Sequence, residues 1–191
     1  MTLSPIERCP WCGNDNLYVK YHDEEWGKEV DSDTVLFEFL VLESAQAGLS
    51  WITILRRREG YRKAFAEFDY KQVAQFDEHK IDALVLDERI IRHRGKIAAT
   101  VKNAQIFIQI QQEFGSFYNY LYSFMPEKKR IVNSLKDLKS AQTHSKESDA
   151  ISKDLKKRGM KFFGTTICYA FMQAVGMVDD HLDSCDFKAV S

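Results

Sequence analysis

The sequence has no long apolar run, few prolines and few β-branched alternations. No stretch approaches the roughly 18 consecutive apolar residues that a membrane-spanning helix needs. The opening MTLSPIERCPWC does not place a charged segment before an apolar one, as a secretory leader does. We therefore expect a cytoplasmic protein that does not use a membrane. The lack of alternation argues against long strands.

Cysteine is also scarce. The four cysteines, Cys9, Cys12, Cys168 and Cys185, are too few and too scattered for a disulfide scaffold in a chain of 191 residues. The reducing compartment inferred above disfavours such a scaffold as well. Metal ligands or free thiols are therefore the better interpretation of these residues.

A large excess of charge of either sign is missing too. The 27 basic and 28 acidic residues give a net charge of -1, which argues against a histone-like binder of polyanions. Basic residues are nevertheless concentrated at 56–58, 92–96 and 156–161. Each cluster alone fits a solvated helix face or a last helical turn, where the helix dipole favours cations. Together they favour an anionic partner.

What the sequence does contain is helical periodicity and enough apolar residues, 45%, for a sizeable core in one domain or two small lobes. Ser50 and Ser148 occupy expected N-caps, and Gly159 and Gly176 lie where helix C-termini favour a left-handed residue. The polar segment 126–147 is expected to be a connection. Helices are predicted at 33–47, 51–66, 71–77, 79–86, 93–113, 116–124, 148–158 and 165–175.

One residue of the first predicted helix is out of place. Glu43 falls on an apolar stripe, which is formed by Leu36, Phe39, Leu40 and Ala47. Charged groups are almost never fully buried without a partner, because desolvating an unpaired charge costs several kcal/mol or more. We therefore expect the carboxylate to point inward and to face a partner.

Aromatic residues gather near this acid. Tyr18, Tyr21 and Trp26 lie within nine residues, and Trp51 follows the acid by eight. Positions 18–26 do not fit one helical stripe, so we expect an irregular segment there. Each ring taken singly is best explained as a core residue. Their density beside an acid is typical of a pocket for a flat, cationic or hydrogen-bond-donating ligand.

Residues with metal-ligand spacing occur at both ends of the chain. Cys9, Cys12 and His22 lie near the start, and His181 and Cys185 form a His-x3-Cys pattern near the end. Two cysteines with two histidines make a closed tetrahedral zinc site, and the spacing does not choose between the first two cysteines. Unrelated thiols are one alternative. Redox chemistry at the C-x-x-C motif is a weaker one, because no βαβ pattern accompanies it.

A helix, a short loop and a second helix are predicted near 148–176. The loop runs from Gly159 to Gly164, and glycines before a helix expose N–H groups at its N-terminus, where the dipole favours an anion. Nearby lysines would add an attraction to a nucleic-acid backbone without sequence preference. An ordinary connection with glycine caps explains the segment equally well.

Six ordered motifs run along nearly the whole chain: ERC (7–9), YHDEEWG (21–27), LESAQAGLSWITILRRRE (42–59), IIRHRGKI (90–97), KRGMKFFGTTICYAFMQAVG (157–176) and DHLDSC (180–185). Together they resemble the 3-methyladenine DNA glycosylase I family. The resemblance implies an all-α helix-hairpin-helix DNA glycosylase fold, in a single domain over 1–191 with two helical lobes. It also implies base excision repair, in which 3-methyladenine is flipped out of double-stranded alkylated DNA and released by hydrolysis, leaving an abasic site.

The resemblance assigns roles by position. It places one structural Zn²⁺ as a clip between 9–22 and 181–185, which leaves Cys12 as an extra thiol beside the metal. The implied zinc ligands are Cys9, His22, His181 and Cys185. The implied base pocket consists of Glu43, with Tyr21 and Trp51 as stacking walls and Tyr18, Trp26 and Trp11 beside them.

DNA contacts are assigned in the same way. The gap left by the flipped nucleotide is expected to be filled by Gln46, Gly48 and Leu49. The backbone grip is expected at Lys161, Gly164, Thr165 and Thr166. Other helix-hairpin-helix glycosylases carry a catalytic aspartate at a distance from the hairpin comparable to that of Asp180, but this family is thought not to use one there.

These assignments give a hypothesis for the chemistry. N3-methylation makes adenine cationic in DNA and weakens the glycosidic bond, so little acid catalysis is required. Glu43 would accept a hydrogen bond from the base while Tyr21 and Trp51 sandwich the ring and hold it for attack by water. No lysine nucleophile is evident, so we expect hydrolysis without strand cleavage. We also expect the protein to be a monomer. The alternatives are a non-catalytic DNA-binding module and a zinc-stabilised redox protein.

Overall fold

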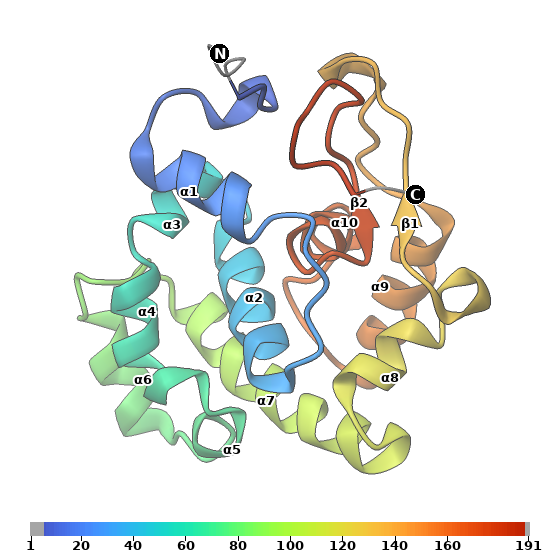
Figure 1. Cartoon of the computed structure of the whole chain (residues 1–191). Helices are drawn as coiled ribbons and strands as arrows, with labels where there is room; N and C mark the ends of the chain where they lie inside the picture. The colour runs from blue at the N-terminus through green and yellow to red at the C-terminus, as the bar shows by residue number, and fades with distance from the viewer. Residues whose placement is uncertain (1–5, 190–191) are drawn as a thin grey trace.

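One buried helix, α2 (Asp33–Gln46), runs through the middle of the molecule, and other helices lie around it (Figure 1). The computed structural model describes residues 6–189. Residues 36–45 of α2 are all buried, because apolar side chains occupy every side of this helix. An element that is apolar all round must be covered on all sides, so α2 forms the centre of the core.

The other elements follow the predicted all-α architecture. In chain order the helical elements are η1 (Pro10–Cys12), α1 (Asn16–Glu24), α3 (Trp51–Leu55), α4 (Arg58–Ala64), η2 (Ala66–Phe68), α5 (Tyr70–Val73), α6 (Glu78–Val85), α7 (Arg94–Phe114), α8 (Phe117–Tyr122), η3 (Pro126–Lys128), η4 (Leu138–Ser140), α9 (Lys146–Arg158) and α10 (Thr165–Ala174). Helices α3, α4, α7, α8 and α10 all contact α2. In Figure 1, α4 to α6 lie on one side of α2, and α8 to α10 lie on the other.

The prediction of an irregular segment at 18–26 is wrong for most of its length, because 18–24 belong to α1. Asp15 caps this helix, and its carboxylate accepts hydrogen bonds from the N–H groups of Leu17 and Tyr18. A capping acid stabilises a helix start whatever the regularity of the apolar pattern that follows. The segment is irregular only from Glu25 onward.

Two further predictions need correction in detail. The helix expected at 51–66 is divided into α3 and α4, with the break at 56–57. The N-cap of α9 is Ser145 rather than Ser148. Ser148 is the N3 partner in a capping box, in which each serine side chain bonds to the backbone N–H of the other. The C-cap at Gly159 is left-handed, as predicted.

A short pair of strands was not expected from the sequence. β1 (Ile131–Val132) pairs in parallel with β2 (Val178–Asp179), with Ile131 opposite Val178. Two residues are too few to produce a recognisable alternation of apolar and polar positions. The pairing holds the polar connection 126–147 beside the segment that follows α10.

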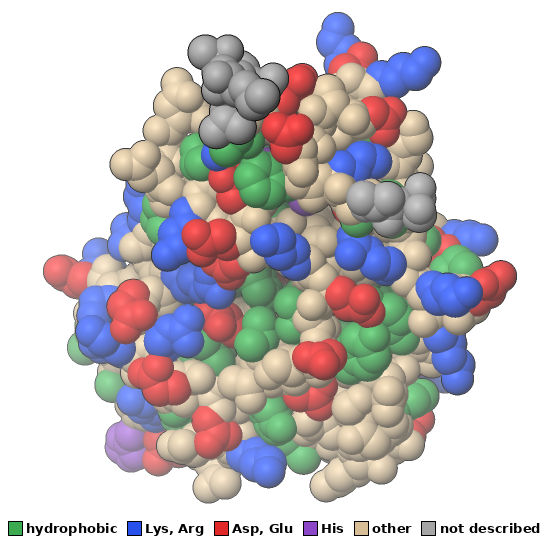
Figure 2. All heavy atoms as spheres, in the orientation of Figure 1, with side chains coloured by type: hydrophobic (Ala, Val, Ile, Leu, Met, Phe, Trp, Pro, Cys, Tyr) green, Lys and Arg blue, Asp and Glu red, His purple; other side chains and the backbone are tan. Residues whose placement is uncertain are grey.

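The two ends of the described chain meet. The backbone N–H of Asp186 donates to the carbonyl of Glu7 at 3.0 Å, and the N–H of Glu7 donates to the Asp186 carboxylate at 2.8 Å. Within residues 6–189, none of the helices has the length and apolar character needed to cross a bilayer. On the face shown in Figure 2, basic and acidic side chains are interspersed, in keeping with the net charge of -1.

Candidate functional site

A cavity of about 220 Å³ lies between α1, α2, α3 and α10, and the connection after β1 covers part of it. Five aromatic residues and two acids line it, together with two glutamines, two leucines and two alanines. The lining residues are Trp11, Tyr18, Tyr21, Trp26, Glu43, Gln46, Trp51, Leu135, Leu138, Ala141, Ala170, Gln173 and Asp180. The sequence-predicted pocket residues therefore meet in one place.

Glu43 provides the most unusual group in this cavity. Its side chain is inside the protein, with 3% of the residue exposed, and its Oε2 atom has no hydrogen-bond partner among residues 6–189. Burial raises the pKa of Glu43 to about 8. A carboxyl group held in this way is protonated at neutral pH until a donor or a positive charge reaches it. The expectation that this acid points inward is confirmed.

Tyr21 and Trp51 form adjoining walls of the cavity. Their ring centroids are 5.4 Å apart and their planes are inclined by 49°. A flat base held between two parallel rings needs a separation of roughly 7 Å, twice the optimal distance between carbon atoms in contact. The two rings here contact each other, so a base lies against this corner unless one ring moves. The Trp51 Nε1 atom is buried without a partner within the described chain.

The other three rings form the remaining aromatic wall. Trp11 stands edge-on to Tyr18, with centroids 5.0 Å apart, and edge-on to Trp26 at 4.9 Å. Trp11 belongs to η1, whose Pro10 occupies the first helical position, as proline's fixed φ favours. Edge-to-face contacts of this kind stabilise aromatic clusters beyond the burial of their area. The wall is therefore well supported without a ligand.

Next to this wall lies a group of potential metal ligands. The Sγ atoms of Cys9 and Cys185 and a ring nitrogen of His22 all lie within 4.8 Å of one another, and all three residues are buried. The ring of His181 stands edge-on to that of His22, with centroids 5.0 Å apart. The two ends of the chain thus bring three of the four predicted ligands within reach of one ion, and the ring of His181, the fourth, packs beside that of His22.

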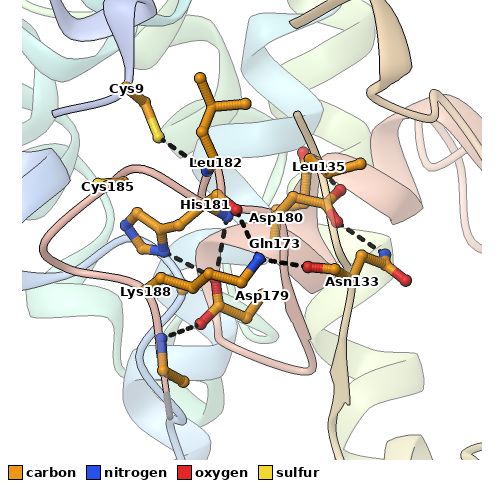
Figure 3. A network of polar contacts seen from close by, with 12 residues as sticks. Cys9, Asn133, Leu135, Gln173, Asp179, Asp180, His181, Leu182, Cys185 and Lys188 are labelled. Atoms are coloured by element: carbon orange, nitrogen blue, oxygen red, sulfur yellow. Dashed lines mark hydrogen bonds and ion pairs between the residues drawn. The ribbon is translucent and has the colours of Figure 1, made fainter. Parts of the chain in front are cut away.

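Both histidines are oriented by aspartates. His22 Nδ1 lies 2.8 Å from Asp23 Oδ1. His181 Nδ1 lies 2.7 Å from Asp179 Oδ1 (Figure 3). Each pairing leaves Nε2 as the nitrogen available to a metal, the usual arrangement around protein-bound zinc. The Nε2 atom of His181 is buried and has no partner within the described residues. The donor set therefore fits a metal ion.

The protonation states in this group depend on burial. Burial lowers the pKa of His22, which favours the neutral imidazole that binds metals. Burial also raises the pKa of the Cys9 thiol to about 12. A bound divalent cation reverses this second effect, because it stabilises the thiolate. Cys12 is buried outside the group of three, and its Sγ donates to the Cys9 carbonyl at 3.1 Å.

Asp180 is the second acid of the cavity, and its carboxylate is fully engaged (Figure 3). Oδ1 accepts from Asn133 Nδ2 at 2.7 Å. Oδ2 accepts from the Tyr169 hydroxyl at 2.8 Å and from Gln173 Nε2 at 2.7 Å. The Asp180 carboxylate thus links α10 to the connection that covers the cavity, and these hydrogen bonds hold the two segments in position.

The predicted DNA-contacting turn follows α2 directly. Gly48 has a φ of +83°, and a Cβ atom there would meet nothing within 4 Å. Leu49 is 38% exposed, an unusual place for a large apolar side chain. Gln46 Nε2 donates to the Leu49 carbonyl at 3.3 Å, and Gln46 also lines the cavity. The turn therefore connects the cavity to the outside of the molecule.

The predicted backbone grip forms a loop between α9 and α10. Gly164 is the exposed N-cap of α10, and Thr166 and Lys161 are exposed. The Thr165 hydroxyl donates to Asp149 Oδ1 at 2.5 Å, so the backbone rather than this hydroxyl is presented outward. Exposed N–H groups at a helix N-terminus attract anions.

Sequence reasoning missed two sets of residues that shape the site. Leu135, Leu138 and Ala141 cover the cavity, although the connection that contains them is polar overall. Their spacing of three residues was the available signal. Asp23 and Asp179 orient the histidines, and their closeness in sequence to the predicted ligands could have identified them.

The chain is similar to known proteins along nearly its whole length. The family model described as methyladenine glycosylase matches residues 11–189. DNA-3-methyladenine glycosylase of Haemophilus influenzae is 48% identical over 181 residues, which is 95% of this chain and 97% of that protein. DNA-3-methyladenine glycosylase 1 of Escherichia coli is 47% identical over 180 residues, or 94% and 96% of the two chains.

Solved structures are similar as well. A crystal structure of 3-methyladenine DNA glycosylase I has a TM-score of 0.92 and 44% identity, and the match covers 96% of this chain and all of the other. A structure of 3-methyladenine DNA glycosylase I from Staphylococcus aureus, solved for its recognition of 3-methyladenine, has a TM-score of 0.93 and 36% identity. That match covers 98% and 100% of the two chains.

Proposed function

Because the chain belongs to the methyladenine glycosylase family, we propose that it flips 3-methyladenine out of alkylated duplex DNA and releases the base by hydrolysis. Its enzyme class is that of a DNA-3-methyladenine glycosylase, a glycosidase of base excision repair. The products are the free base and an abasic site. The observation that carries the proposal is the buried, unpartnered carboxyl of Glu43 inside an aromatic cavity.

Glu43 selects the methylated base through charge. The carboxyl has a pKa of about 8 in this cavity, because burial disfavours its ionised form. A nearby positive charge favours the ionised form, and N3-methylated adenine in DNA carries that charge. Entry of the lesion therefore couples to loss of the Glu43 proton, and the carboxylate then accepts a hydrogen bond from the base. An unmethylated, neutral base carries no positive charge and therefore does not favour ionisation of Glu43.

The aromatic residues hold the ring for attack by water. Tyr21 and Trp51 present a corner against which the base packs, and Trp11, Tyr18 and Trp26 close the other side. Contact between a base and an aromatic side chain contributes roughly 1–3 kcal/mol. The cationic base is already a good leaving group, so holding it in the cavity supplies most of what the reaction needs.

The residues around the cavity support hydrolysis without strand cleavage. Lyase chemistry requires an amine that forms a Schiff base with the sugar. No lysine is among the described residues that line the cavity. Treatment of a reaction mixture with borohydride is therefore expected to trap no covalent complex with DNA, and a trapped complex would contradict this part of the proposal.

Two surface elements contact the DNA in this proposal. Leu49, with Gln46 and Gly48, fills the space left by the flipped nucleotide, and its exposure suits that role. Lys161, Gly164, Thr165 and Thr166 grip the phosphate backbone, in the helix-hairpin-helix at about 148–176, chiefly through N–H groups at the start of α10. Binding of this kind has little sequence preference.

A structural zinc ion completes the proposed protein. Cys9, His22, His181 and Cys185 supply two sulfur and two nitrogen ligands, a combination that suits tetrahedral Zn²⁺. Four protein ligands leave no open position for water, so the ion supplies stability to the two joined ends and takes no part in the reaction. Within residues 6–189 none of the four cysteines forms a disulfide, which suits the cytoplasmic location that we propose. We also propose a monomer.

The deciding experiment is base release from methylated duplex DNA, with 3-methyladenine and 7-methylguanine separated. We expect selective release of 3-methyladenine by zinc-loaded protein. Failure of folded, zinc-loaded protein to release any base would contradict the proposal and leave a DNA-binding module as the better interpretation.

A further inference from the structure

Helix α7 reaches the end of α2 through one lysine. Lys96 Nζ donates to the carbonyl of Ala45 at 2.9 Å and to that of Ala47 at 2.6 Å. The last carbonyls of a helix have no partner within the helix and carry the negative end of its dipole. A lysine at this place satisfies two of them at once. Lys96 therefore fixes where α2 ends.

The Lys96 hydrogen bonds lie between Glu43, which faces the cavity, and the turn that contains Leu49. Glu43 precedes Ala45 and Ala47, whose carbonyls Lys96 binds, by two and four residues, about one helical turn. The turn with Gly48 and Leu49 follows them directly. The N–H of Leu49 donates to the Gln46 carbonyl at 2.7 Å, so the turn is continuous with the helix end. A shift of the α2 end that Lys96 binds would therefore move Leu49 relative to the cavity.

The same helix also holds the second proposed DNA contact. Asn103 Nδ2 donates to the carbonyl of Lys161 at 3.0 Å, and the N–H of Lys161 donates to Asn103 Oδ1 at 3.0 Å. Asn103 is buried, with 1% exposed. Paired bonds to both backbone groups of one residue fix that residue in position and orientation. The Asn103 side chain thus fixes the loop between α9 and α10 to α7.

We propose that α7 is a brace that sets the distance between the two DNA contacts, with Lys96 and Asn103 as its positioning residues. The two residues are seven apart, so they lie on one face of the helix, about 10 Å along its axis. An α-helix of 21 residues is stiff enough to hold such a spacing. The inference rests on the proposed function, because it assumes that the turn and the loop engage the same duplex.

If Lys96 is a positioning residue, its replacement has different effects from those expected if Lys96 contacts a phosphate directly. A positioning lysine affects the placement of Leu49 in duplex DNA and leaves the base cavity itself intact. A lysine that contacts phosphate affects the salt dependence, because each lost contact lowers the slope of log K against log salt by about one. The two roles are therefore separable by experiment.

The test compares Lys96→Met with Lys102→Met. Lys102 is an exposed lysine of the same helix, so its replacement removes the same charge without touching α2. Three quantities are measured on zinc-loaded proteins: the single-turnover rate of 3-methyladenine release from duplex DNA, the affinity for free 3-methyladenine by tryptophan fluorescence, and the salt slope of DNA binding. Wild-type protein in the same assay reports separately on the proposed function.

For Lys96→Met we expect a rate loss of about 10- to 100-fold, the effect of a misplacement of about 1 Å. Its affinity for the free base and its salt slope should match those of wild type, and Lys102→Met should match wild type throughout. A rate equal to that of Lys102→Met would overturn the inference. So would an equal loss of free-base affinity, or a salt slope reduced by about one. If the wild type itself releases no base, the proposed function fails, and the brace fails with it.

Discussion

The indole of Trp26 packs edge-on against the imidazole of His181, with 4.6 Å between the ring centroids and 72° between the planes. Trp26 also lines the cavity, and Trp11 beside it lies 5.2 Å from the ring of His22. The base cavity and the metal cluster therefore share an aromatic wall. Disturbance of one site is expected to reach the other through these rings.

Removal of zinc should consequently weaken base binding as well as stability. We expect a chelator to lower the melting temperature sharply, since structural zinc sites contribute on the order of 10 kcal/mol of folding free energy in small modules. Affinity for free 3-methyladenine should fall in parallel, because Trp26 and Trp11 lose their support. Thermal melting, tryptophan fluorescence and elemental analysis measure these effects. Added Zn²⁺ should restore both properties, and Mg²⁺, which prefers oxygen ligands, should not.

Unchanged melting and base affinity in protein shown to be free of zinc would contradict this prediction.

Gly27→Ala should damage the metal cluster selectively. A Cβ atom at Gly27 would lie 2.7 Å from Cε1 and 3.0 Å from Nδ1 of His181, and the φ of +74° is already unfavourable to alanine. Displacement of one orienting contact costs roughly 10- to 100-fold in metal affinity. Competition with a chromophoric chelator measures that loss. Gly115→Ala is the matched control, because its φ is +83° and its nearest neighbour lies at 3.6 Å.

A loss of metal affinity as large in Gly115→Ala would show that backbone strain, rather than the clash with His181, is responsible.

Glu43→Gln should slow excision of 3-methyladenine by about 10- to 100-fold. The amide keeps the shape of the side chain but cannot become the carboxylate that pairs with a cationic base, and a hydrogen bond to a charged group contributes about 1.5–3 kcal/mol. Single-turnover rates on alkylated duplex DNA measure the loss. Glu24→Gln, on the exposed side of α1, should behave as wild type. Unchanged excision by Glu43→Gln would remove this residue from the mechanism.

The same substitution should stabilise the protein at high pH. Below about pH 4.5 the Glu43 carboxyl is protonated in both the folded and the unfolded state. Between that value and the folded-state pKa of about 8, only the unfolded state loses its proton, so the free energy of unfolding falls as the pH rises. Above about pH 8 the carboxyl is ionised in both states, and the folded protein bears the full cost of burying the charge. Glutamine has no such dependence.

Urea unfolding of both proteins with zinc bound, at about pH 5 and about pH 9, is the measurement. The free energy of unfolding of Glu43→Gln relative to wild type should rise by a few kcal/mol between these conditions. A difference that does not change with pH would mean that burial does not raise this pKa.

Asp180→Asn should reduce stability more than catalysis. The amide directs an N–H toward groups that now donate to the carboxylate, including the Tyr169 hydroxyl and Gln173 Nε2. The free energy of unfolding should fall by about 1–3 kcal/mol. Excision by the folded variant should fall by less than about tenfold, far below the 10²–10⁴-fold effect of a general acid or base. A hundredfold loss in well-folded protein would instead identify Asp180 as catalytic.

The sequence by itself predicted the all-α architecture and most of the longer helices, although not α1, and it identified the candidate site residues. The apolar stripe of α2 predicted one buried face, on which Glu43 stands out because a carboxylate is costly there. The structure buries all ten residues from 36 to 45. The candidate metal ligands could be recognised because cysteine and histidine are chemically distinctive and their spacing within each end is short. The motif resemblance chose Cys9 over Cys12, and the cluster of Cys9, His22 and Cys185 agrees with that choice.

Tertiary structure alone decided what lies across the cavity from Glu43 and how the two elements proposed to contact DNA are spaced. Leu135 and Gln173 reach the cavity because a parallel pair of two-residue strands and the Asp180 hydrogen bonds bring distant segments together. Lys96 and Asn103 find their backbone partners about 50 or more residues away. Local patterns report which face of a helix is buried, whereas such long-range contacts depend on how the faces pack, and periodicity in one segment carries no information about that.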